Sequence, residues 1–419
     1  MSFVTHMLDI KYIRDNVDKI KENNKNRHVT VNIDHFLELD EQKRTIKTQI
    51  EELRATRNQG SKGKPTPEEM QKMKEVGETI KGLEEQLAPT EQEYHELLLQ
   101  IPNRTHTDSP IGGEEHFNVL EMHGNLPAFD FPAKDHVELM ETLDIIDFER
   151  GAKVTGSKFY FLKNDAVRLN QALINYGMDI LSKHGYTLIE TPDLAKQEVL
   201  EGIGFNPRGE EKQIYNIENE NLSLIGTAEI TIGGYHQDEV LDLSNGPKKY
   251  AAISHCFRTE AGAYGRTSKG LYRVHQFTKL EMFIFCKPED SESLHQELLT
   301  IEKEICDGLE LAYRVIDIPT GDLGGPAYRK FDIEAAMTMK DGDYGEITST
   351  SNCTDYQARR LNIKYKNEAG KNEYVHTLNG TAVVLSRFPL ALIEQHQQKD
   401  GSIHIPKALV PYIGKDLIK

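Results

Sequence analysis

Two long polar segments with regularly spaced apolar residues constrain the fold of this chain more than any other feature. The first carries Leu39, Ile46, Ile50 and Leu53, separated by seven, four and three residues. The second carries Met73, Val76, Ile80, Leu83, Leu87, Tyr94, Leu97 and Ile101. Such spacing places one narrow apolar stripe on each helix, which is typical of a two-stranded coiled coil.

The sequence NQGSKGKPTPEE, residues 58–69, separates the two stripes. Its glycines and prolines end helices, and Thr66 followed by Pro67 and two glutamates is typical of a helix N-terminus. We therefore predict an antiparallel helical hairpin with its tip near residues 59–65. Pro89 lies within the second stripe and is expected to kink that helix.

The first helix of this hairpin and its tip are basic, although the whole chain is acidic. A net charge of −17 argues against general affinity for nucleic acid. Between residues 42 and 64, however, seven cations face only two glutamates, which leaves a local charge of +5. The cations are Lys43, Arg44, Lys47, Arg54, Arg57, Lys62 and Lys64. A solvated helix face would explain this run, and so would a limb that contacts a phosphate backbone.

Several classes of protein are disfavoured by the rest of the composition. No apolar run reaches the roughly 20 residues that a membrane-spanning helix needs. The four cysteines (Cys256, Cys286, Cys306 and Cys353) are widely spaced and form no zinc-ligand pattern. We therefore expect reduced thiols, no zinc, no membrane partner and a cytoplasmic location. Residues 1–34 are expected to contain a short helix with Leu8, Ile13, Val17 and Ile20 on one face.

After about residue 135 the pattern changes to short strands with few long helices. Residues 250–260 and 274–286 are rich in strand formers and flank a loop that contains Gly262, Gly265 and Gly270. This arrangement predicts an antiparallel strand pair. Without regular alternation of strands and helices, the region is best described as an α+β domain on a mainly antiparallel sheet.

The predicted strand pair concentrates charged and aromatic side chains. Arg258 and Glu260 are two residues apart and are expected to share one sheet face, as are Phe277, Lys279 and Glu281. Such a surface could hold a planar base together with an anion and a cation. A cross-strand ladder of ion pairs would explain the same residues equally well.

Three segments resemble the signature motifs of class II aminoacyl-tRNA synthetases. Motif 1 corresponds to GYTLIETPDL (185–194), motif 2 to FRTEAG and LYRVHQFTKLE (257–262 and 271–281), and motif 3 to LNGTAVVLSR (378–387). Two more, IGTAEI (225–230) and SNCTDYQARRLNIKY (351–365), resemble the seryl members of the class. Over nearly its whole length the chain is similar to the seryl-tRNA synthetases.

This resemblance implies a domain organisation and a reaction. Residues 1–110 would form a helical tRNA-binding arm, 111–135 a linker and 136–419 a class II catalytic domain. The enzyme would activate L-serine with ATP, forming seryl-adenylate, and transfer serine to the 3′ end of serine tRNA. Selenocysteine tRNA is left open as a second acceptor, and motif 1 would form a homodimer.

The resemblance also implies an ATP site, in which Arg258 and Arg387 would be catalytic. Arg258 would bind the α-phosphate and the serine carboxylate, Arg273 the outer phosphates, and Arg387 the γ-phosphate or the second face of the adenine. Glu260 would accept from the adenine amino group, Phe277 would stack on the base, and Glu346 and Ser349 would hold Mg²⁺. The full ATP set is Arg258, Thr259, Glu260, Arg273, Val274, Phe277, Glu346, Ile347, Thr348, Ser349 and Arg387.

The resemblance also implies a binding site for serine. Thr227 and Glu229 would receive the serine ammonium, and Glu281 and Thr381 would bond its hydroxyl. The full serine set is Thr227, Ala228, Glu229, Arg258, Glu281, Asn379 and Thr381. The seven cations of the arm would contact the long variable arm of serine tRNA. Motif 3 departs from the family pattern, since Ala382 and Ser386 stand where glycine is common; Ser386 is a predicted N-cap, with Pro389 in the first helical turn.

Two other functions remain open at this point. One is a ligase of the same fold that aminoacylates a carrier protein and lacks the arm; the long hairpin argues against it. The other is a non-catalytic module that uses its coiled coil for binding. The intact set Arg258, Glu260, Glu281, Glu346, Ser349 and Arg387 argues against this second alternative.

Overall fold

The computed structural model describes residues 8–60, 66–205, 213–260, 269–340 and 342–419. Contacts within the chain divide it into a unit of residues 7–104 and a unit that contains residues 105–419. The division thus falls six residues before the boundary expected at residue 110. In the described part of the chain, no helix is both long and apolar enough to cross a membrane.

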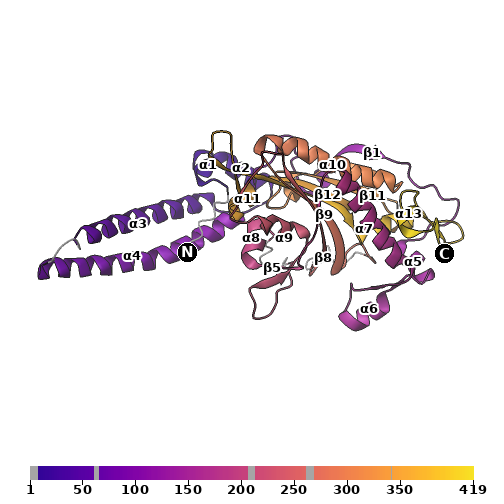
Figure 1. Cartoon of the computed structure of the whole chain (residues 1–419), viewed down its shortest axis with the longest axis horizontal. Helices are drawn as coiled ribbons and strands as arrows, with labels where there is room; N and C mark the ends of the chain where they lie inside the picture. Colours follow the sequence, from indigo (N-terminus) through magenta and orange to yellow (C-terminus); the bar gives the residue numbers. More distant parts are fainter. Residues whose placement is uncertain (1–7, 61–65, 206–212, 261–268, 341) are drawn as a thin grey trace. The chain divides into compact units, whose positions relative to one another are not determined.

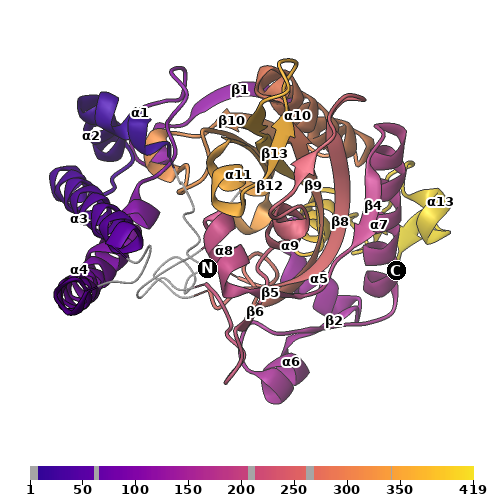
Figure 2. The same ribbon diagram turned by 60° about the vertical axis from the view of Figure 1, so that its left-hand side comes forward.

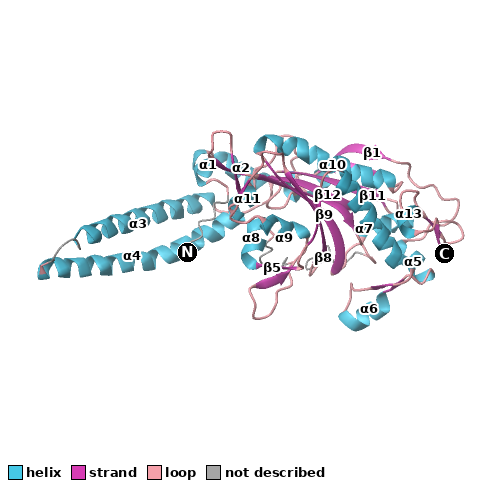
Figure 3. Ribbon diagram, viewed as in Figure 1, coloured by secondary structure: helices cyan, strands magenta, loops and turns pink. Residues whose placement is uncertain are grey.

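Helices build the N-terminal unit, coloured cyan in Figure 3. They are α1 (Ile10–Asp15), α2 (Val17–Asn26), α3 (Ile33–Gly60) and α4 (Pro67–Gln100). The single helix expected near the N-terminus is wrong: the helix ends at Asp15, and Asn16 uses its side-chain amide to donate to the Tyr12 carbonyl at 3.1 Å. Such a local bond competes with continued helix.

The hairpin of α3 and α4 is confirmed (Figure 1). Helix α4 begins as predicted: Thr66 is its N-cap, Pro67 is its first residue, and Thr66 and Glu69 form a reciprocal capping box. Pro89 lies inside α4 without ending it. Of the predicted stripes, Leu39, Ile50, Ile80, Tyr94 and Ile101 are buried, and the ring of Tyr94 stacks on that of Phe36 at 4.8 Å. The expected tip lies mostly outside the described residues.

An eight-stranded sheet forms the centre of the C-terminal unit, in the order β1-β10-β11-β12-β15-β9-β8-β4. Its strands are β1 (Asn118–His123), β4 (Thr187–Glu190), β8 (Lys248–Phe257), β9 (Gln276–Cys286), β10 (Tyr313–Asp317), β11 (Arg329–Ala336), β12 (Tyr344–Thr354) and β15 (His376–Val384). Neighbours are antiparallel except for β4, which pairs with β8 in parallel. The α+β class is confirmed. Segment 111–135, expected as a linker, contributes edge strand β1 because its residues pair with β10.

Helices cover both faces of this sheet, as Figure 2 shows. Helices α7 (Asp165–Lys183) and α10 (Ser291–Gly308) contact one face, and α8 (Gln197–Ile203), α9 (Ala228–Tyr235) and α11 (Tyr356–Leu361) pack at the other. Strand β9 alternates between them: Leu280 and Met282 join the first apolar cluster, and Phe283 and Phe285 join the second. Lys279 and Glu281 therefore belong to the α9 face.

Shorter elements complete the unit. The helices are α5 (His136–Thr142), α6 (Phe148–Thr155), α12 (Arg387–Gln395) and α13 (Val410–Ile413). The strands are β2 (Ile146–Asp147), β3 (Phe161–Leu162), β5 (Leu194–Lys196), β6 (Leu222–Leu224), β7 (Val240–Leu241), β13 (Lys364–Lys366), β14 (Asn372–Tyr374), β16 (Ile403–His404) and β17 (Leu417–Ile418). Ser386 is the N-cap residue of α12, as predicted, but its hydroxyl makes no capping bond.

Candidate active site

The predicted strand pair is confirmed: β8 and β9 are paired from Lys248 opposite Phe285 to Phe257 opposite Gln276. The face prediction for Arg258 and Glu260 is wrong, because β8 ends before them and Glu260 has a φ of 46°. Strand alternation does not reach these two residues, yet both line one pocket. Gly262 and Gly265 of the expected loop lie outside the described residues.

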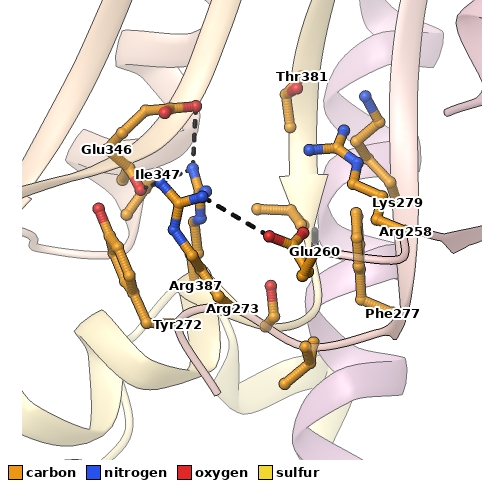
Figure 4. A pocket seen from close by; sticks show the side chains of 13 residues that line it. Arg258, Glu260, Tyr272, Arg273, Phe277, Lys279, Glu346, Ile347, Thr381 and Arg387 are labelled. Carbon is orange, nitrogen blue, oxygen red and sulfur yellow. Dashed lines mark hydrogen bonds and ion pairs between the residues drawn. The ribbon is translucent and has the colours of Figure 1, made fainter. Parts of the chain in front are cut away.

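The pocket gathers side chains from segments far apart in the sequence (Figure 4). They come from the segment after β8, the segment before β9, strands β9, β12 and β15, and the start of α12. The lining residues are Arg258, Glu260, Tyr272, Arg273, Val274, Phe277, Lys279, Glu346, Ile347, Thr381, Val384, Ser386 and Arg387. Eight of the eleven residues expected to bind ATP are among them.

Arginines and carboxylates are paired within this pocket. Arg387 Nη1 lies 2.9 Å from a carboxylate oxygen of Glu346 and donates to the Glu346 carbonyl at 3.1 Å. Arg273 lies 3.6 Å from Glu260. Burial alone would raise the pKa of Glu346, but the positive charges of Arg387 and Lys330 outweigh it and hold that pKa below its usual value. The carboxylate of Glu346 therefore stays ionised.

Two cation–ring contacts complete the geometry. The guanidinium of Arg258 lies 5.2 Å from the ring centre of Phe277, and that of Arg387 lies 5.0 Å from the ring centre of Tyr272. Arg258 Nε also donates to the Gly226 carbonyl at 3.2 Å. These contacts fix planar guanidinium groups in direction as well as position.

A β-bulge in β12 determines which side chains share its pocket face. Glu346 and Thr348 are opposite consecutive residues of β11, so Ile347 is the extra residue. Without the bulge, Glu346 and Ser349 would face opposite sides, being three residues apart; with it, they share a face. Thr348 lies on the other side, where its hydroxyl donates to Glu302 at 2.9 Å. The side chain of Thr348 is thus separated from the pocket.

The oxygens of Glu346 and Ser349 are hard donors of the kind that Mg²⁺ prefers. Among the described residues, no cluster of three or more His, Cys, Asp or Glu side chains is arranged to hold a metal. A magnesium ion that entered with ATP would fit here, because such ions take few protein ligands and complete their shell with phosphate oxygens and water.

Beside the pocket lies a partly buried polar cluster centred on Glu229. One of its carboxylate oxygens accepts from Gln357 at 2.7 Å and from Asn379 at 3.0 Å. Burial, with the neighbouring Glu281, raises the pKa of Glu229 to about 7. Thr227 caps α9 by accepting from the Glu229 amide at 3.2 Å.

Glu281 links this cluster to the pocket. It forms an ion pair with Lys279 and stands opposite Thr381 in the β9–β15 pairing. Burial raises its pKa, although Lys279 counteracts the shift. Of the other expected serine residues, Ala228 is fully buried at the start of α9, and Arg258 lines the pocket.

Sequence reasoning missed several residues that belong here. Lys279 was placed on the same strand face as Phe277 and Glu281 but not assigned to the site, although its parity was the signal. Tyr272 and Gln357 lie within the segments quoted for the family resemblance, 271–281 and 351–365, but were assigned no role, since their contacts depend on how distant segments meet. Thr259, expected with the ATP set, does not line the pocket; its backbone amide donates to the Gln213 carbonyl at 3.2 Å.

Four of the cations predicted on the arm have identified partners within the arm: Lys43, Arg44, Lys47 and Arg54. Lys43 lies over the ring of Tyr94, 3.1 Å from its centre, and burial lowers its pKa to about 8. Other pairs join Lys47 to Glu91 and Arg54 to Glu84, each at 2.7 Å, and Arg44 to Glu41 at 3.1 Å. Arg57 is exposed in α3, whereas Lys62 and Lys64 lie outside the described residues. Carboxylates of α4 thus offset part of the local positive charge.

Comparisons with known proteins agree with this geometry. Residues 7–105 match the seryl-tRNA synthetase N-terminal domain, and residues 213–396 match the tRNA synthetase class II core domain (G, H, P, S and T). The chain is 54% identical to a serine--tRNA ligase of Treponema denticola, covering 98% of this chain and 100% of that protein. It is 51% identical to one of Rubrobacter xylanophilus, over 98% and 99%.

Solved structures show the same similarity. The seryl-tRNA synthetase of Pyrococcus horikoshii complexed with ATP has a TM-score of 0.89 at 37% identity, over 98% of this chain and 99% of that one. The cytoplasmic serine-tRNA ligase of Naegleria fowleri in complex with AMP has a TM-score of 0.84 at 33% identity, over 99% of both chains. The chain therefore belongs to the seryl-tRNA synthetase family of class II aminoacyl-tRNA synthetases.

Proposed function

We propose that this protein is a serine--tRNA ligase, which activates L-serine with ATP and transfers the seryl group to the 3′ end of serine tRNA. The observation that carries the proposal is the convergence of Arg258, Arg273 and Arg387 in one pocket, next to the polar cluster of Glu229. The names of the bacterial relatives and the ATP-bound archaeal structure support it.

Activation requires no general base in this site. The serine carboxylate is already a nucleophile; it attacks the α-phosphorus of ATP and displaces pyrophosphate. What opposes the step is repulsion between anions and the entropy of alignment. Arginines fixed by Glu346, Glu260 and ring contacts offset the repulsion, and positioning in such sites is worth about 7–11 kcal/mol.

We assign the nucleotide to the lined pocket. Arg258 would contact the α-phosphate and the serine carboxylate, because its planar fork matches both groups. Arg273 and Arg387 would meet the outer phosphates, Phe277 would stack on the adenine, and Glu260 would accept from its amino group. Val274 and Ile347 would provide apolar walls, and the backbone of Thr259 and Thr348 would set the position of their neighbours.

Mg²⁺ would accompany ATP at Glu346 and Ser349. When bound, it neutralises phosphate charge and so supports the same displacement. The role of the protein is to present an ionised carboxylate and a hydroxyl on one face, which the bulge at Ile347 achieves.

Serine would bind at the polar cluster. Glu229 and Thr227 would receive its ammonium group, Asn379 would hold Glu229 in place, and Glu281 with Thr381 would bond its hydroxyl. Alanine would leave these buried groups unpaired, and sites of this kind reject the analogue that lacks a hydroxyl by about 10⁴-fold.

The remaining assignments concern partners. The cations of α3 would contact the backbone of serine tRNA. A homodimer through motif 1 is supported by β4, which is the last strand in the sheet order and carries Leu188 with 46% of its surface exposed. We assign the protein to the cytoplasm, a compartment in which a tRNA substrate is present.

Serine-dependent exchange of pyrophosphate into ATP tests the proposal. We expect exchange with serine and little with alanine or glycine. Exchange driven by alanine or glycine instead would indicate the carrier-protein ligase, and no exchange with any amino acid would indicate a non-catalytic module. Charging of serine tRNA by the same preparation tests the second half-reaction.

A further inference from the structure

A buried histidine outside the pocket connects three segments that shape it. His136 is the first residue of α5 and is fully buried. Its Nε2 accepts from the backbone amide of Leu271 at 3.0 Å. On its other side, its Nδ1 lies 2.8 Å and its backbone nitrogen 2.9 Å from one carboxylate oxygen of Glu394, which is also fully buried.

The bond from Leu271 determines the tautomer of this histidine. Because a backbone amide can only donate, Nε2 carries no proton, and the proton lies on Nδ1, which donates to Glu394. The second carboxylate oxygen of Glu394 accepts from the Met339 amide at 3.1 Å. Each side-chain polar atom of the pair therefore has a defined partner, and one oxygen of Glu394 has two, Nδ1 and the backbone nitrogen of His136.

Each segment held by this pair ends at the pocket. Leu271 directly precedes Tyr272 and Arg273, and Glu394 lies on α12, whose first residue is Arg387. Met339 precedes Lys340, whose ammonium group lies 4.9 Å from the ring centre of Tyr272, the ring that Arg387 also contacts.

Gly270 shows how closely the first segment approaches. Its φ is +59°, and a Cβ at this position would lie 2.1 Å from Nε2 of His136 and 2.5 Å from a methyl group of Val137. Only glycine fits both the backbone conformation and the space. A neighbouring ion pair, Lys269 with Asp135, holds the same segment to the start of α5.

We propose that His136 and Glu394 form a positioning pair for the nucleotide: they hold Tyr272, and through it the guanidinium of Arg387, where the phosphates of ATP are bound. Neither residue lines the pocket, so the pair acts through its neighbours. This inference rests on the proposed function, since it assigns the pair to ATP rather than to serine.

Two substitutions of the histidine separate its two bonds. His136→Gln can place an amide oxygen near Nε2 and so still accept from Leu271, whereas His136→Asn can still donate to Glu394 but leaves the buried Leu271 amide unpaired. His396→Asn is the matched control, because His396 follows the same helix and its Nε2 bonds the Leu309 carbonyl at 2.9 Å. ATP affinity is measured by calorimetry, and KM values by pyrophosphate exchange.

We expect His136→Asn to weaken ATP binding and raise KM for ATP by about 10-fold, with KM for serine changed less than about twofold. His136→Gln should recover most of the loss, and His396→Asn should leave both KM values unchanged. A fall in kcat alone, or an equal rise in both KM values, would overturn the proposal.

Glu394→Gln provides an independent test if His136→Asn fails to fold. The glutamine has nearly the same shape as Glu394, but one acceptor oxygen becomes an NH2 group. That group then faces a hydrogen-bond donor, either the Met339 amide or His136. The same selective loss of ATP affinity is expected, and unchanged ATP affinity would contradict the inference. Because calorimetry reads ATP binding without turnover, absent exchange in the parent enzyme would refute the proposed function separately.

Discussion

The pocket and the helical hairpin use the same chemistry at different depths. In the pocket, Arg387 and Glu346 lie 2.9 Å apart, with 17% and 41% of their side chains exposed. On the hairpin, Arg54 and Glu84 lie 2.7 Å apart, with 53% and 47% exposed. Judged by distance alone, the hairpin pair would be the stronger of the two. Because the pocket pair is less exposed, we nevertheless expect its loss to have the larger effect.

The difference lies in what each cation loses when it is replaced. The charges of an exposed pair are solvated in the folded and in the unfolded protein, so the pair contributes about 0–1 kcal/mol to stability. A pocket arginine is held by a ring, a carbonyl or a carboxylate, and is already oriented for the phosphate that we propose it binds. The pocket should therefore respond to single changes, and the hairpin mainly to the loss of many contacts at once.

The largest effect is expected at Arg258. Arg258→Ala should lower the rate of serine-dependent exchange by about 10³-fold or more, because it removes charge and geometry at the proposed α-phosphate. Arg258→Lys, which keeps the charge without the planar fork, should recover only part of the activity. Thermal unfolding checks that the fold is retained. Near-normal exchange in the alanine variant would mean that the α-phosphate binds elsewhere.

A large deletion in the hairpin should also cause a large loss of activity, but in a different reaction. Removing residues 42–88, with the helix ends joined by a short glycine-rich turn, should leave exchange within about twofold while charging of serine tRNA falls by about 100-fold or more. The physical reason is that the proposed ATP and serine sites both lie in the C-terminal unit, which the deletion leaves intact. Charging that survives the deletion would contradict the role proposed for the cations of α3.

How much of each region the sequence predicts also differs. The hairpin follows from local rules: apolar spacing, and Thr66 with Pro67 at a helix start, place α3 and α4 correctly. The sequence analysis did not predict the ion pairs between the two helices, because a count of charges along α3 does not include Glu84 and Glu91 on α4.

The pocket needed more than local rules. The resemblance to a known family selected most of its lining residues, and the β8–β9 pair was predicted from strand composition. The bulge at Ile347, the turn at Glu260 and the position of Tyr272 were not predictable, since each depends on register or on contacts between distant segments. Strand alternation was the wrong reason to expect Arg258 and Glu260 side by side, because β8 ends before both residues.

A pH effect of intermediate size should distinguish the serine cluster from the exposed pairs. Burial, with the charge of Glu281, raises the pKa of Glu229 to about 7, so the carboxyl is largely neutral at pH 6 and largely ionised at pH 8. A neutral carboxyl attracts an ammonium group less, so KM for serine should rise by about tenfold as pH falls from 8 to 6.

The control for this effect is Glu229→Gln, which keeps the amide partners within reach but cannot ionise. Its KM for serine should be high at both pH values and nearly independent of pH. Measurement of exchange against serine concentration at pH 6, 7 and 8 gives both curves. A parent enzyme whose KM for serine stays constant over this range would refute the assignment of the ammonium group to Glu229.

The smallest effects are expected on the hairpin, where opposite substitutions of one pair give opposite signs. Arg54→Gln should weaken tRNA binding about two- to threefold at low salt, whereas Glu84→Gln removes the carboxylate that competes with phosphate for Arg54 and should strengthen binding by a similar factor. Neither should change the free energy of unfolding by more than about 0.5 kcal/mol. Filter binding at two salt concentrations and thermal unfolding measure the two quantities. If both variants instead lose stability and bind tRNA equally well, Arg54 stabilises the packing of α3 on α4 and does not contact tRNA. A cation that contacts phosphate should bind it more tightly once Glu84 no longer competes.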